Sequence, residues 1–116
     1  MKKLVRRALA DADILAALDY YVANAPEYAL SFLDALEHAY QHIQKFPATG
    51  SPRYAHELDL PELRVWSCNK FPYLVFYAEH PNQIEIWRVL HSSRDIPISL
   101  QFEIFTNEGE MGSDSI

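Results

Sequence analysis

The chain has 116 residues, 49% of them hydrophobic, and a formal net charge of −6. This length fits one domain, and the balance of apolar to charged residues excludes an intrinsically disordered protein. The acidic charge argues against sequence-independent binding to nucleic acid, which depends on neutralising phosphates. We expect no direct sequence-specific binding of nucleic acid by the chain alone either.

No apolar run reaches the roughly 20 residues that cross a bilayer, and the basic start MKKLVRR leads into an acidic helix, not a signal-peptide core. The one cysteine, Cys68, excludes an intramolecular disulfide, as is usual in a reducing compartment. We therefore expect a cytoplasmic protein that does not bind membranes.

The first quarter of the chain predicts a strand followed by a helix. Residues 2–7 place Leu4 and Val5 between basic residues, which is typical of a short strand at a sheet edge. Residues 8–23 predict a helix, because apolar side chains recur at spacings of four and three. These side chains are Ile14, Leu18 and Tyr21.

A second helix is predicted over residues 27–46. Asn24 and Pro26 mark the turn before it, since Asn caps helices and Pro is tolerated in a first helical turn. Its apolar stripe again follows spacings of four and three, so the two helices should form an antiparallel hairpin. The stripe consists of Phe32, Leu36, Ala39, Ile43 and Phe46.

The remaining sequence predicts a loop over residues 47–60 and then three strands joined by short turns, over 63–68, 71–78 and 83–90. This order indicates an α+β fold in which the helices cover one sheet face and the other stays partly open. Residues 99–105 are expected to dock or form a short helix. The acidic residues 103–116 are expected to be disordered.

Short motifs follow one another in a fixed order between residues 8 and 97. Each is weak alone, but their order and spacing are specific, and the chain resembles the ParE-like toxins of the RelE/ParE superfamily, which includes plasmid stabilisation proteins. The motifs are Asp13-Ile14, Tyr20-Tyr21, Ala29, Phe32, Phe46-Pro47, Gly50, Leu63-Arg64, Phe71-Pro72-Tyr73, Tyr77, Arg88-Val89-Leu90-His91 and Arg94-Asp95.

The resemblance implies a single toxin domain over residues 1–102, with an N-terminal strand, an antiparallel helical hairpin and a three-stranded antiparallel meander. It further implies a bacterial type II toxin-antitoxin module, in which an antitoxin tail wraps and neutralises the toxin. ParE-like members poison DNA gyrase, whereas RelE-like relatives cut messenger RNA in the ribosomal A site. A third hypothesis is a non-toxic relative that acts only as a binding partner. No cofactor is implied.

The expected chemistry favours gyrase binding over RNA cleavage. Cleavage through the RNA 2′-hydroxyl needs a base, an acid and cations that stabilise charge on the phosphate. Leu74 lies about where nuclease relatives carry an arginine, so the resemblance implies that a central cation is missing. We therefore expect no catalytic residues, and His91 and Arg94 would be catalytic only in a nuclease.

Five residues are candidates for contacts with the target or the antitoxin, and each also has a structural interpretation. His91 and Arg94 would otherwise fix the chain through the backbone and Asp95. Two arginines, placed on neighbouring strands, would otherwise form ion pairs with Glu62 or Glu85, and a tryptophan would otherwise pack in the core. The candidates are Arg64, Trp66, Arg88, His91 and Arg94.

His38 and His42 have a helical spacing that can hold a metal ion. They share a helix face with Asp34, Gln41 and Lys45, opposite the apolar stripe, so a solvated face is the better interpretation. No metal site is predicted.

Overall fold

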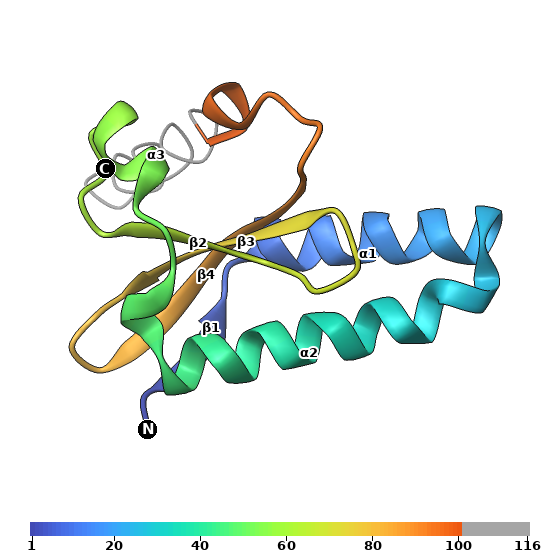
Figure 1. Ribbon diagram of the computed structural model, residues 1–116, viewed down its shortest axis with the longest axis horizontal. Coiled ribbons are helices and arrows are strands. Elements are labelled where there is room, and N and C mark those ends of the chain that lie inside the picture. Colours follow the sequence, from blue (N-terminus) through green and yellow to red (C-terminus); the bar gives the residue numbers. More distant parts are fainter. Residues whose placement is uncertain (101–116) are drawn as a thin grey trace, which may run out of the picture.

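A computed structural model describes residues 1–100. The expected disorder of residues 103–116 lies outside these residues. The predicted helices and strands appear in the expected order, with two single 3₁₀ turns and one further helix, α3, among them (Figure 1). They are β1 (Lys3–Arg6), α1 (Ala8–Asn24), η1 (Pro26–Tyr28), α2 (Ala29–Lys45), η2 (Pro47–Thr49), α3 (Arg53–Glu57), β2 (Leu63–Ser67), β3 (Tyr73–Glu79) and β4 (Gln83–His91).

The four strands form one mixed sheet in the order β1-β4-β3-β2. The antiparallel meander of β2, β3 and β4 confirms the predicted α+β fold, and β1 lies at the edge as expected. β1 pairs with β4 in parallel, with Lys3 opposite Gln83 and Arg6 opposite Ile86. The placement of Arg64 and Arg88 on neighbouring strands was wrong, because β3 lies between β2 and β4.

The helical hairpin packs on one sheet face and extends beyond it at one end (Figure 1). On α2 the predicted stripe is confirmed for Phe32, Leu36, Ala39 and Ile43, which are buried, but it was wrong for Phe46, which follows the helix and is 54% exposed. On α1 the expected apolar residues are only partly buried, and the fully buried ones are Ala10 and Ala17. Small side chains allow this helix to approach the sheet closely.

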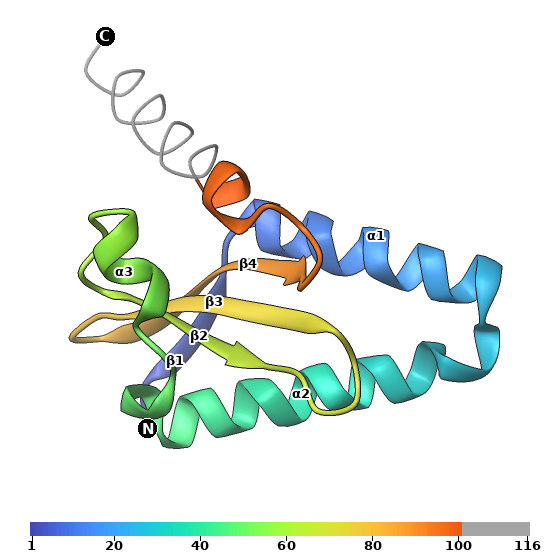
Figure 2. The same cartoon turned by 45° about the horizontal axis from the view of Figure 1, so that its top comes forward.

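The opposite sheet face is also covered, so the expectations of a partly open face and of a loop over residues 47–60 were both wrong. Residues 47–60 contain η2 and α3, and α3 packs over the sheet together with helical residues 96–100 (Figure 2). The apolar side chains of this stretch are too few and too irregular to show a helical period. The second core contains Ala55, Leu63, Val65, Phe76, Ala78, Trp87, Leu90, Ile96 and Leu100.

A register shift in β4 changes which of its residues face each core. Phe76 pairs with Arg88 and Tyr77 with Ile86, so Trp87 is an extra residue on β4, as in a β-bulge. The alternation of faces therefore reverses beyond Trp87: Ile84, Ile86 and Val89 belong to the helix-side core, and Trp87 and Leu90 to the second core. No helix among the described residues is long and apolar enough to cross a membrane.

Candidate functional site

Arg88 is held by a carboxylate from the first helix. β1 ends at Arg6, and α1 then runs beside the free edge of β4. The Asp13 carboxylate accepts hydrogen bonds from Arg88 Nε at 2.7 Å and Nη2 at 2.8 Å, and from the Val89 N–H at 3.0 Å. Arg88 is only 7% exposed. The expected ion pair with Glu62 or Glu85 was therefore wrong, and Arg88 joins α1 to β4.

Arg64 also has an internal role, and its expected partner was wrong as well. Its Nη1 donates to the Gly50 carbonyl at 2.8 Å. The Tyr77 hydroxyl accepts from the Gly50 N–H at 3.0 Å and donates to the Pro47 carbonyl at 2.6 Å. A Cβ on Gly50 would lie 2.2 Å from that hydroxyl, so the close approach of backbone and ring requires glycine. Arg64 and Tyr77 thus fix the segment that follows α2.

His91 and Arg94 are the two candidates that the structure brings together. They line a groove of about 400 Å³ at the ends of α1, β3 and β4, with Tyr20, Tyr21 and Tyr73 among the other lining residues. The Arg94 side chain is exposed. Burial raises the pKa of Tyr21 and of Tyr73, so both hydroxyls remain protonated near neutral pH.

Hydrogen bonds define the tautomer of His91. Its Nδ1 accepts from the Ser93 N–H at 3.1 Å and lies 2.7 Å from Ser93 Oγ. Because a backbone N–H can only donate, the neutral ring carries its proton on Nε2. The ring also meets Tyr73 edge-on, with centroids 5.2 Å apart. Asp95 does not hold these side chains, since its carboxylate accepts from the Ile98 N–H.

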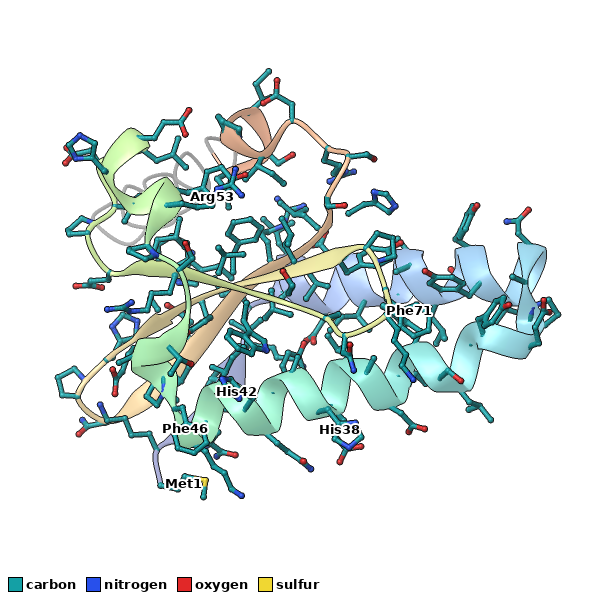
Figure 3. All side chains as sticks on the ribbon, viewed as in Figure 1. Met1, His38, His42, Phe46, Arg53 and Phe71 are labelled. Carbon is teal, nitrogen blue, oxygen red and sulfur yellow. The ribbon has the colours of Figure 1, made fainter. Side chains whose placement is uncertain are left out.

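Trp66 lies elsewhere, in contact with α2. Its ring stacks on His42 at 3.9 Å between centroids and an angle of 11°. Thr49 Oγ1 donates to the Phe46 carbonyl at 2.8 Å, so His42 Nε2, 2.9 Å away, is its donor. The stack leaves His42 half-buried, whereas His38 and the other residues of the expected solvated face are exposed (Figure 3). In the sequence, the only indication of this contact was the presence of an aromatic residue, Trp66, on the strand that packs against α2.

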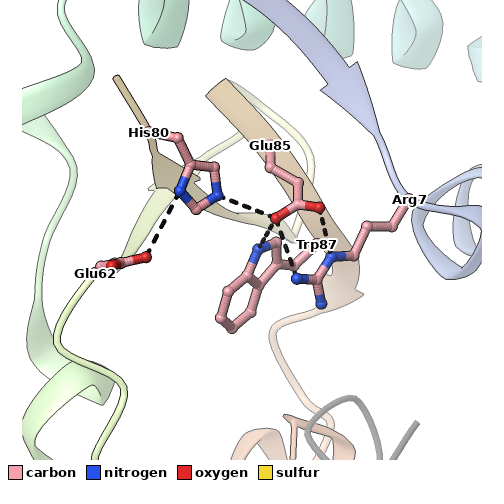
Figure 4. Close-up of polar contacts among 5 residues, drawn as sticks. All are labelled: Arg7, Glu62, His80, Glu85 and Trp87. Atoms are coloured by element: carbon pink, nitrogen blue, oxygen red, sulfur yellow. Dashed lines mark hydrogen bonds and ion pairs between the residues drawn. The ribbon is translucent and has the colours of Figure 1, made fainter. Parts of the chain in front are cut away.

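Sequence reasoning missed a polar cluster around Glu85 (Figure 4). Arg7 donates to both carboxylate oxygens, and the Trp87 indole N–H donates at 3.0 Å. His80 lies 3.2 Å from Glu85 and 3.7 Å from Glu62, and the Arg7 guanidinium lies 4.4 Å from the Trp87 ring centroid. The cluster ties the β1–α1 junction, β4 and the β3–β4 turn together on the second sheet face.

The edge strand, the helical hairpin and the antiparallel meander form the fold that the resemblance to RelE/ParE toxins implies. A family model described as "ParE toxin of type II toxin-antitoxin system, parDE" matches residues 4–96. The chain belongs to this ParE toxin family, and a ParDE system supplies a cognate ParD antitoxin as its partner.

A solved structure, "Chromosomal ParDE TA system from P. aeruginosa", is similar with a TM-score of 0.65. Its identity to this chain is 23%, and the match covers 78% of this chain and 96% of that one. At this identity the likeness supports the fold alone. No curated protein sequence matches the chain.

Proposed function

We propose that this ParE toxin arrests bacterial growth in the cytoplasm by binding and poisoning DNA gyrase, without enzymatic chemistry of its own and without a metal or cofactor, until ParD neutralises it. The observation that carries the proposal is that two arginines are held by contacts within the protein. Arg88 is paired with Asp13, and Arg64 donates to the Gly50 carbonyl, so both guanidinium groups already have structural partners.

The groove at the end of β4 is better suited to binding than to cutting RNA. Its rim carries Tyr20, which is 60% exposed, beside His91 and the exposed Arg94. Tyrosine and arginine are the residue types that anchor protein interfaces. Leu74, at the position where nuclease relatives carry an arginine, packs against the second core. We assign Arg94, His91 and Tyr20 to the contact with gyrase.

The test is a plasmid assay with purified toxin and gyrase that follows supercoiling and cleaved DNA on one gel. We expect loss of supercoiling and accumulation of linear plasmid, both reversed by ParD. Arg94→Ala should weaken poisoning at least tenfold, whereas Lys45→Ala, at an exposed lysine on α2, should not change it. Intact supercoiling in the presence of excess folded toxin would overturn the proposal.

RNA cleavage is the second candidate, and the groove geometry is the observation that favours it. The His91 Nε2–H and the Arg94 guanidinium would serve as proton donor and phosphate clamp on messenger RNA bound to the ribosome. Mapping of messenger RNA ends in a translation extract separates the two functions. Cleavage at A-site codons that is lost in His91→Ala would favour the nuclease.

A non-toxic relative would leave growth unchanged when it is expressed without its antitoxin. The growth assay therefore precedes both biochemical tests, and it requires only induction of the chain alone and together with ParD.

A further inference from the structure

The outer edge of β2 leaves one backbone pair open. Val65 exchanges both of its backbone hydrogen bonds with Ser51, at 2.9 Å each, so its N–H and C=O point away from β3. In an antiparallel ladder these directions alternate every residue. Ser67, two residues along the same strand, therefore also points its N–H and C=O outward, and within residues 1–100 no backbone hydrogen bond to either group is found.

Two hollows flank Ser67, one on each face of the sheet. The helix-side hollow, about 430 Å³, has His42, Trp66 and Lys70 among its lining residues. The hollow on the second face, about 450 Å³, is lined in part by Arg53 and Tyr54. An added strand sends alternate side chains to opposite faces, so its neighbouring residues would enter these two hollows.

The basic residues that line the two hollows favour an acidic occupant. Arg53 and Lys70 are their charged lining residues, and neither lining includes a carboxylate. The Arg53 guanidinium lies over the Tyr54 ring, with 4.7 Å to its centroid, and Figure 3 labels Arg53 at α3, of which it is the first residue. Exposed Lys70 follows the end of the strand. An acidic, extended segment complements this edge.

We propose that an extended acidic segment of the ParD antitoxin adds to the sheet at Ser67. Its backbone pairs with the Ser67 N–H and C=O, the side chain opposite Ser67 enters the Arg53–Tyr54 hollow, and the next side chain enters the Trp66–Lys70 hollow. The inference rests on the proposed function only in taking ParD as the partner. It concerns a surface distinct from the His91–Arg94 groove assigned to gyrase.

The test compares Ser67→Pro with Ser67→Ala in binding to full-length ParD. Proline removes the outward N–H and fills the edge, and edge strands tolerate proline where the N–H faces solvent. Alanine keeps the backbone donor. We expect Ser67→Pro to weaken ParD binding about tenfold or more, as loss of one hydrogen bond and a steric block imply, and Ser67→Ala to leave it within about twofold.

A charge variant and amide exchange complete the experiment. Arg53→Gln should weaken binding and its salt dependence, while Lys45→Gln, outside both hollows, should not. In the wild-type toxin, hydrogen exchange at the Ser67 amide should slow when ParD binds, a readout that does not depend on any variant folding. ParD that binds Ser67→Pro like wild type, or leaves the Ser67 amide unprotected, overturns the strand addition. ParD that does not bind wild type overturns the neutralisation itself.

Discussion

Asp13 on α1 and Arg88 on β4 are 75 residues apart in the chain, yet they share two charge-assisted hydrogen bonds in a place where both side chains are nearly buried. The Asp13 carboxylate also accepts from the Val89 N–H, next to the bulge at Trp87. The Asp13 carboxylate therefore pairs with the charge of Arg88. It also accepts a hydrogen bond from the backbone of β4 at Val89, beyond the residues that pair with β1.

Removing either partner of the Asp13–Arg88 pair should lower the stability of the protein. Asp13→Ala leaves the Arg88 charge without its carboxylate, and Arg88→Met leaves the carboxylate without its guanidinium, so each should lower the free energy of unfolding by about 3–5 kcal/mol. Urea denaturation measures both. The double variant should lose less than the sum, because neither charge then remains buried alone. Losses below about 1 kcal/mol in both single variants would contradict the assignment.

The contact between Gly50 and Tyr77 predicts a second sensitive position. Gly50→Ala places a methyl group against the buried Tyr77 ring, so it should destabilise the protein by about 1–3 kcal/mol. Tyr77→Phe removes the nearest atom, and part of the loss should be recovered when the alanine is introduced into that background. Thermal unfolding of the four proteins gives this coupling. Additive effects would show that the hydroxyl is not the obstacle.

The Glu85 cluster predicts a loss of stability in acid. Burial alone raises the pKa of Glu85, but the hydrogen bonds from Arg7, His80 and Trp87 and the charge of Arg7 outweigh it, so the pKa falls below its ordinary 4.5. The folded-state pKa is then lower than the unfolded one. The contribution of Glu85 is present above about pH 4.5 and is lost as pH falls through the folded-state pKa.

Glu85→Gln isolates this contribution. The difference in unfolding free energy between wild type and Glu85→Gln should shrink as pH falls from about 6 to about 3. Denaturation at several pH values measures it, with Glu62→Gln as the control, because Glu62 is mostly exposed and its carboxylate lies 3.7 Å from His80. A difference that stays constant over this range would refute the assigned charge state.

Tyr40 predicts a substitution that does not destabilise. Its hydroxyl is buried without a hydrogen-bond partner among the described residues, and burial raises its pKa far above the ordinary value. Tyr40→Phe removes an unsatisfied polar atom, so stability should be unchanged or rise by up to about 1 kcal/mol. Chemical denaturation is the measurement. A loss above about 1 kcal/mol would mean that the hydroxyl has a partner.

Regular patterns in the sequence predicted the regular parts of the fold. The stripe from Phe32 to Ile43 identified α2, because a helix that buries one face must repeat its apolar residues. The same logic did not identify α3, whose five residues are too few for a period. It also missed the closest face of α1, where the buried residues are Ala10 and Ala17, not the larger apolar ones.

The candidate site was harder to predict, since it depends on contacts between distant segments. His91 and Arg94 were found because the family motif keeps them together. The partner of Arg88 was missed because a same-face neighbour such as Glu85 is the local choice, whereas Asp13 reaches it only after α1 docks beside β4. The stack of His42 on Trp66 likewise required the packing of α2 against β2.

The parallel pairing of Lys3–Arg6 with residues 83–86 has a consequence for synthesis. The first strand to leave the ribosome has to wait for the last strand before its ladder can close, while the helical hairpin between them needs only local contacts. Sheet closure is therefore a late event that joins the two ends of the domain. A nascent or truncated chain lacking β4 has no complete sheet and no His91–Arg94 groove, so a prematurely terminated product should lack the contact with gyrase that we propose for this groove.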